Sequence, residues 1–142
     1  VNASKTKEMI VHFGRSNRNI PPLQIDSSSI ERVVIFKLLG VIFSSDLTLS
    51  AHILHMLAKT EKRLYVIYQL VRAGVNQFDI VSVYCSLIRS VLEYACPVWH
   101  CGLTIGQSDD IENIQKRCLR IIFPENGYRR GVRDSFVNFL MK

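Results

Sequence analysis

The stretch FKLLGVIFSSDLTLSAHI, which runs from Phe36 to Ile53, decides the fold of this chain because its hydrophobic period changes along it. Its first half is an apolar strand pattern that contains Lys37 and Gly40, and a glycine in a strand is typical of a bulge or a close backbone approach. Its second half offers Ser50 as the N-cap of a helix. Three earlier residues could serve as the cap instead: Ser44, Ser45 and Asp46.

Upstream of this stretch the sequence predicts further strands. The expected elements are, in order, a strand at 5–13, a loop at 14–22, a short strand at 23–26 and a longer strand within 27–36. Pro21 and Pro22 mark the loop because proline cannot donate to a strand ladder. Residues 38–43 either continue the longer strand or pair back on it, and we expect a hairpin within residues 30–43.

Downstream of this stretch, apolar residues recur at helical spacing in three segments. The expected segments are a helix from about 50 to a C′ glycine at Gly74, a helix from about Gln77 to Ala95 ended by Pro97, a loop at 98–106, and a helix from near Ser108, capped by Ser108 or Asp109, to Pro124. Strands come first and helices second. This order predicts an α+β fold, in which a small antiparallel sheet or hairpin precedes a three-helix bundle.

The composition describes a globular protein with a basic surface. The chain has 142 residues, of which 48% are hydrophobic and 21% charged, and its formal net charge is +6. The charge mildly favours a polyanionic partner. No apolar run approaches the roughly 18 residues that a membrane helix needs, and no signal peptide is visible. We therefore expect an intracellular protein, nuclear or cytoplasmic and not secreted, without a membrane partner.

The cysteines and histidines do not predict a metal site. Four cysteines in a chain without a secretion signal favour reduced thiols. Cys96, His100 and Cys101 lie close together, but a zinc site would want C-x2-C spacing and a second pair elsewhere. His52 and His55 are three residues apart and lack a visible third ligand. The sequence therefore predicts neither a metal ligand set nor a cofactor.

Four stretches carry a family resemblance. VNASKTKEMIVHF (1–13) is similar to an N-x-x-K-T-K segment, FKLLGV (36–41) to F-K-Y-L-G-V, SSDLTLSAHI (44–53) to S-x-D-L-T-W-S-x-H-I, and LEYACPVWHCGLTIGQSDDIENIQKRCLRII (92–122) to a helical continuation ending in I-Q-K-R-A-x-R-I-I. In this order they resemble the C-terminal part of the reverse transcriptase domain of non-LTR (LINE) retrotransposons of the jockey, CR1 and RTE kind. The chain departs from that pattern at Leu38, Leu49 and Cys118, where tyrosine, tryptophan and alanine are usual.

The resemblance implies a division of the chain and a set of contact residues. Residues 1–46 would be the C-terminal remnant of a palm with its primer-grip hairpin, 47–123 a helical thumb-like region, and 124–142 a divergent tail. The partner would be the backbone of an RNA or DNA template and primer. The residues expected to contact it are Lys5, which matches a palm lysine near the leaving pyrophosphate, Lys37 and Gly40 in the primer grip, and Lys59, Lys62 and Arg63 in the thumb.

Each of these residues also has an explanation that needs no ligand. A lysine in an edge hairpin commonly prevents edge-to-edge aggregation, so Lys37 could serve the fold alone. Gly40 could mark a bulge. The cationic segment 59–63 could simply be a solvated helix face.

The catalytic carboxylates of such polymerases are not recognisable in this sequence. The family places two adjacent aspartates in a turn between apolar strands, where they hold two Mg²⁺ ions. The adjacent pair in this chain, Asp109 and Asp110, lies at a polar helix start and is expected to cap that helix. Both ends of the chain also look cut. We therefore expect a fragment without catalytic residues, not an enzyme on its own, whose parent would supply the missing palm, fingers and Mg²⁺.

Three alternatives remain open from the sequence. The chain could be a non-catalytic helical interaction module, or the product of a pseudogene. Segments such as 1–13 and 36–43 also resemble the N-terminal extension of an AlkB-type oxygenase that acts on tRNA. That chemistry uses an H-x-D…H iron triad, and this sequence contains no H-x-D.

Overall fold

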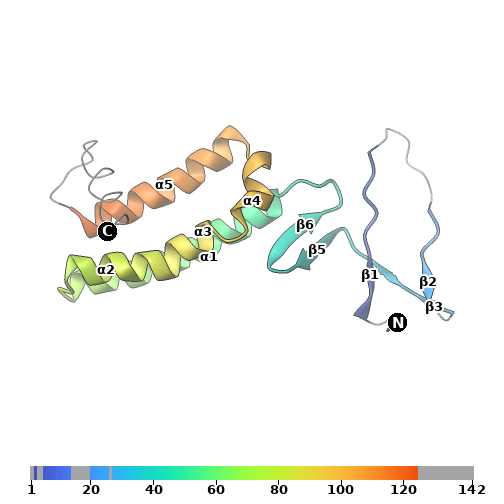
Figure 1. Cartoon of the computed structure of the whole chain (residues 1–142), viewed down its shortest axis with the longest axis horizontal. Helices are drawn as coiled ribbons and strands as arrows, with labels where there is room; N and C mark the ends of the chain where they lie inside the picture. Colours follow the sequence, from blue (N-terminus) through green and yellow to red (C-terminus); the bar gives the residue numbers. More distant parts are fainter. Residues whose placement is uncertain (1, 3–4, 14–19, 26, 125–142) are drawn as a thin grey trace. The chain divides into compact units, whose positions relative to one another are not determined.

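The computed structural model describes residues 2, 5–13, 20–25 and 27–124. Short strands come first and helices follow, so the α+β fold class is confirmed (Figure 1). The chain divides into two compact units. The first unit comprises residues up to Leu54 together with Pro97–Leu103, and the second comprises His55–Cys96 and the described residues from Thr104 onward. The predicted tail at 124–142 lies outside the described residues apart from Pro124.

Among the described residues of the first unit, the strands form three two-stranded sheets. Strands β2 (Gln24–Ile25) and β3 (Ser28–Ser29) are antiparallel, as are β5 (Ile35–Leu38) and β6 (Val41–Ser44), whereas β1 (Lys7–Glu8) and β4 (Glu31–Arg32) are parallel. The strand expected at 5–13 is therefore only two residues long, and it pairs in parallel. Its partner β4 is equally short because the chain bends at Val34 to enter β5.

The predicted hairpin is present, and it is formed by β5 and β6. Leu38 pairs with Val41, so only Leu39 and Gly40 form the turn. Residues 38–43 thus pair back instead of continuing the preceding strand. Gly40 lies in the turn and not inside a strand. Of the two expectations for this glycine, the bulge is therefore wrong, and the close approach of another backbone stays a prediction.

Helix α1 (Ser50–Arg72) begins and ends with defined local structures. The carboxylate of Asp46 accepts hydrogen bonds from the amide and the hydroxyl of Thr48, at 3.0 and 2.9 Å, and this turn leads into the helix. Ser50 is the first helical residue and not the cap. At the other end, the amides of Gly74 and Val75 donate to the carbonyls of Val71 and Leu70, and Gly74 has a φ of 71°. This is a Schellman motif, so the predicted C′ glycine is confirmed.

The second helical segment contains a change of helix type. It consists of α2 (Gln77–Tyr84), a π-helical turn η2 (Cys85–Arg89) and α3 (Ser90–Leu92), and the side chain of Asn76 caps its start. The predicted end at Ala95 is three residues too late, because Ala95 adopts a left-handed φ of 52° that no helix can continue.

The segment expected to be a loop at 98–106 is mostly helical. Helix α4 (Cys96–Trp99) and the 3-10 turn η3 (His100–Gly102) occupy it, with Pro97 in the first turn of α4 where proline is tolerated. Helix α5 then runs over Ile105–Ile122. Its cap is Thr104, which forms a capping box with Gln107, so the predicted start near Ser108 is wrong.

The helices of the second unit bury a shared apolar core. The side chains buried there come from the part of α1 after Leu54, from α2, η2 and α3, and from α5: Met56, Leu64, Ile67, Ile80, Val81, Tyr84, Ile88, Leu92, Ile114, Cys118 and Ile122. The side-chain nitrogen Nε2 of Gln77 donates a hydrogen bond to the main-chain carbonyl of Ile122 at 3.4 Å. This bond connects the start of α2 with the end of α5. Within the described residues, no helix is both long and apolar enough to cross a bilayer.

Candidate nucleic-acid interface

The turn of the β5–β6 hairpin has left-handed backbone at both of its residues. Leu39 has a φ of 47° and Gly40 a φ of 85°, the pattern of a two-residue type I′ turn, whose twist matches that of the paired strands. Gly40 adopts this conformation without steric cost, whereas Leu39 carries a side chain in a region that L-residues disfavour. The backbone at the tip is therefore fixed, and the Leu39 side chain there is 85% exposed.

Lys37 projects from the hairpin face that lies opposite the buried one. Side chains alternate along a strand, so Lys37 shares a face with its partner Ile42, while Leu38 shares the other face with Val41. Val41 is only 4% exposed, whereas all four residues of β5 are exposed. A backbone phosphate could therefore approach the Lys37 ammonium without displacing the packed face.

His52 fixes strand β6 to the first turn of α1. Its Nδ1 accepts a long hydrogen bond, 3.5 Å, from the amide of Ile42, and the imidazole is 4% exposed. Its ring centroid lies 6.4 Å from that of Trp99, which is 3% exposed. Because Nδ1 can accept only when it carries no proton, this contact requires an imidazole with a bare Nδ1. The burial of both rings makes them packing residues of the first unit, a role that the sequence did not assign to His52.

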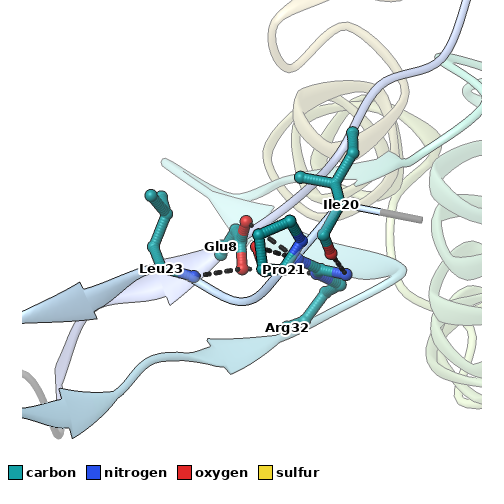
Figure 2. Close-up of polar contacts among 5 residues, drawn as sticks. All are labelled: Glu8, Ile20, Pro21, Leu23 and Arg32. Carbon is teal, nitrogen blue, oxygen red and sulfur yellow. Dashed lines mark hydrogen bonds and ion pairs between the residues drawn. The ribbon is translucent and has the colours of Figure 1, made fainter. Parts of the chain in front are cut away.

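A second cluster in the first unit holds β1 against β4. The Arg32 guanidinium contacts both carboxylate oxygens of Glu8, at 3.2 and 3.3 Å, and also donates to the carbonyls of Ile20 and Pro21 (Figure 2). The Glu8 carboxylate also accepts from the amide of Leu23, at 3.4 Å. The Glu8 side chain is 8% exposed, so these donors compensate a nearly buried charge.

Lys5 lies just ahead of this cluster. Its side chain is exposed, and its amide donates to the carbonyl of Asn2 at 3.1 Å. The next lysine, Lys7, forms an ion pair with Glu31 across the β1–β4 pair. Lys5 thus keeps an accessible ammonium beside an anchored strand, whereas the charge of Lys7 is matched within the fold.

The remaining predicted cations lie on α1 in the second unit. Lys59 and Lys62 are exposed. Arg63 is half-buried, and its guanidinium donates a hydrogen bond to the main-chain carbonyl of Leu87 in η2. The first unit therefore carries Lys5, Lys37 and Gly40, the second carries these three cations, and of the latter Arg63 has a clear internal role.

The Leu87 carbonyl that accepts from Arg63 lies inside the π turn η2. In η2 the amide of Ser90 donates to the carbonyl of Cys85, five residues back, which shifts the regular α-helical pairing. Beyond the π turn the amides again donate to the carbonyl four residues back, as the amide of Glu93 does to Arg89. The π turn therefore holds one residue more than a regular α-helical turn. The Arg63 guanidinium supplies a charged donor at this point. Sequence reasoning missed this π turn because one inserted residue leaves the apolar pattern of the helix nearly intact.

The acidic residues of α5 lie on its exposed side. Asp109 and Asp110 are exposed and lie inside α5, so their predicted capping role is wrong, because Thr104 caps that helix. Elsewhere on α5 Glu112 pairs with Lys116 at 2.7 Å. Among the described residues, no three histidine, cysteine, aspartate or glutamate side chains gather closely enough to hold a metal ion.

Two buried groups in the second unit are shifted toward their neutral forms. Burial raises the pKa of the Cys118 thiol to about 12, and burial, followed by the neighbouring thiols, raises the pKa of the Tyr84 phenol. Neither group can serve as a nucleophile or base near neutral pH.

Comparison with known proteins found no relative. No protein-family profile, no curated protein and no solved structure matches this chain.

Proposed function

We propose that this chain holds the sugar–phosphate backbone of template and primer in an RNA-directed DNA polymerase of a mobile element. The four stretches that resemble non-LTR reverse transcriptases motivate the proposal. The observation that carries it is the β5–β6 hairpin, in which an exposed Lys37 lies beside a turn of fixed backbone geometry. A cation on a rigid element can contact a phosphate at little cost in backbone entropy.

The second unit supports the same proposal with an independent set of cations. Lys59 and Lys62 lie on α1 among residues that form a continuous helix. Between His55 and Arg72 the sequence has four lysines and arginines but a single acidic residue, Glu61. Such an excess of positive charge favours a polyanion over a neutral partner.

The test is duplex binding at several salt concentrations. We expect an RNA–DNA hybrid and a DNA duplex to bind with little sequence preference. For three phosphate contacts, affinity should fall by about 40-fold between 50 and 200 mM salt, following the counterion-release slope of about 0.9 per contact. An affinity that stays flat over this range would overturn the electrostatic basis of the proposal.

Charge-matched variants separate the proposed contacts from bulk charge. Lys37→Gln, Lys59→Gln and Lys62→Gln should each lower the salt slope by about 1. Lys116→Gln removes the same charge from α5, where Lys116 already pairs with Glu112, and should leave the slope nearly unchanged. Equal effects of all four substitutions would show that only net charge matters.

The proposed role is non-catalytic. The carboxylates and the Mg²⁺ ions would belong to the palm and fingers of the polymerase, and this chain would supply backbone contacts. We expect no primer extension by the purified chain with Mg²⁺ or Mn²⁺. Template-dependent nucleotide incorporation above that of a denatured control would contradict this assignment.

A second candidate is a protein-interaction module, favoured by the apolar surface of the hairpin. Ile35 and Leu38 are 55% and 52% exposed, next to the more exposed Leu39. Leu38→Asp should abolish any self-association in sedimentation without changing duplex affinity if this surface binds protein. If it lowers duplex affinity as much as Lys37→Gln does, the hairpin serves nucleic acid instead.

The proposed partner also implies the compartment. A template–primer duplex is met in the nucleus or the cytoplasm, where the four free cysteines would stay reduced. Localisation of a tagged chain by microscopy, with a secreted control, tests this part of the proposal.

A further inference from the structure

Two tyrosines on the solvent face of α1 are exposed to an unusual degree. Tyr65 is 66% exposed and Tyr68 is 50% exposed. They are three residues apart, so they lie on the same face of the helix, separated by about 4.5 Å along its axis. Large aromatic side chains that face solvent in adjacent positions are candidates for contact with a ligand.

Cations flank both rings on the same face. Lys62 precedes Tyr65 by three residues, and Arg72 follows Tyr68 by four. The Arg72 guanidinium carbon lies 5.9 Å from the centroid of the Tyr68 ring, so the guanidinium lies over that ring. The order along the helix is therefore cation, ring, ring, cation.

The opposite side of the same helix is used for packing. Met56, Leu64 and Ile67 are at most 5% exposed and belong to the core of the second unit. The tyrosines thus lie away from the core side, and their exposure does not come from a frayed end. Glu61 is the acidic residue of this face, one turn before Tyr65, and the surrounding charge is still positive.

We infer that Tyr65, Tyr68, Lys62 and Arg72 form a stacking site for unpaired nucleotides. Each phenol ring would stack on one base, and the flanking cations would contact the adjacent phosphates. Stacking requires an open base face, which a duplex does not offer, so the ligand is a single-stranded segment of DNA or RNA. The inference rests on the proposed function and extends it from duplex backbone to unpaired strand.

The charge pattern favours nucleic acid over a protein ligand. A protein that covered two tyrosines would need acidic groups to match Lys62 and Arg72, whereas a polynucleotide provides phosphates and flat aromatic bases together. Base stacking on aromatic side chains also tolerates any sequence, as expected for a strand-holding role.

The experiment compares an oligothymidylate of about 15 nucleotides with a DNA duplex of the same length, using the complete chain. Tyr65→Leu and Tyr68→Leu should each weaken oligothymidylate binding by about tenfold and change duplex binding by less than about twofold. Tyr65→Phe and Tyr68→Phe keep the ring and remove only the hydroxyl, so they should bind as the parent chain does. Circular dichroism of each variant verifies that the helix content of the chain is retained.

The outcomes distinguish this inference from the proposed function. Unchanged oligothymidylate binding in both leucine variants, with duplex binding still dependent on salt and on Lys59, would overturn the stacking site and leave the proposed function standing. Equal losses in the leucine and phenylalanine variants would also overturn stacking, because the hydroxyl would then be the contact. Absence of salt-dependent binding to either nucleic acid would overturn both.

Discussion

The guanidinium of Arg63 in α1 donates a hydrogen bond to the main-chain carbonyl of Leu87, 24 residues further along the chain and inside the π turn of the second helical segment. One side chain thereby links two helices and satisfies a backbone group where the helix changes type. The family resemblance implies a phosphate contact at Arg63, and its geometry adds a structural role. Binding experiments should therefore rely on the exposed neighbours Lys59 and Lys62.

Replacing Arg63 should destabilise the second unit. Arg63→Met keeps the long apolar stem but removes the donor, which leaves the Leu87 carbonyl without its charged partner. We expect the free energy of unfolding to fall by about 1–3 kcal/mol. Lys62→Met, a substitution at an exposed neighbour, should change it by no more than about 0.5 kcal/mol. Urea unfolding followed by far-ultraviolet circular dichroism measures both, and equal effects would contradict the assigned bond.

The Glu8–Arg32 pair should control local opening of the first unit. Arg32→Met leaves a nearly buried carboxylate without its main donor, and because Arg32 itself is about one-third exposed we expect a cost of about 1–2 kcal/mol. The amide of Val33 donates to the carbonyl of Glu8 at 2.8 Å, so its hydrogen exchange reports this opening. Glu8→Gln combined with Arg32→Met should cost less than the two single changes added together, and strict additivity would rule out coupling.

Replacing Leu39, whose backbone is left-handed, should stabilise the β5–β6 hairpin. Leu39→Asn places the residue preferred at the first position of a type I′ turn, where φ is 47°. We expect a gain of about 1 kcal/mol in the stability of the hairpin, since a bulky side chain in this region costs about that much. Leu38→Asn, in the adjoining strand, should give no gain. Thermal unfolding compares the two, and a loss of stability in Leu39→Asn would show that the Leu39 side chain makes contacts worth more than the strain.

Thiol reactivity should differ strongly among the cysteines. Cys101 is exposed, whereas Cys118 is fully buried and burial raises its pKa to about 12. Because the thiolate is the reactive form, a maleimide at neutral pH should label Cys101 first and Cys118 only after unfolding. Cys101→Ser should remove the fast phase. Labelling of Cys118 in the native protein at a comparable rate would contradict its packing.

Acid should loosen the turn that precedes α1. Hydrogen bonds, first from the amide of Thr48, lower the pKa of Asp46 below its usual 3.8. A lowered carboxyl pKa contributes stability that is complete above the usual value and is lost as the pH falls through the folded value. We expect the Thr48 amide signal in nuclear magnetic resonance to shift below about pH 4, and Asp46→Asn to weaken this dependence. A signal that stays constant down to pH 2 would contradict the turn.

Local rules explain which features the sequence could predict. The hairpin follows from an apolar run broken by one glycine, and the end of α1 follows from Gly74, because each depends on residues adjacent in the chain. The start of α5 was missed because Thr104 competes with Ser108 and Asp109, and only the reciprocal bonds with Gln107 decide among them.

Non-local pairing explains what the sequence could not show. The parallel contact of β1 with β4 joins segments 24 residues apart and is set by the Glu8–Arg32 pair, which no periodicity encodes. The residues of the candidate interface also differ in how far the sequence could predict their placement. Exposure of Lys37 follows from strand alternation, whereas the destination of the flexible Arg63 side chain depends on a carbonyl in another helix.

The burial of Trp99 against His52 gives the protein an intrinsic optical reporter. Trp99 is the single tryptophan of the chain, and it belongs to the first unit, so its fluorescence follows that unit alone. Unfolding exposes the buried indole to water. The emission of Trp99 will therefore record the opening of this unit without any attached dye.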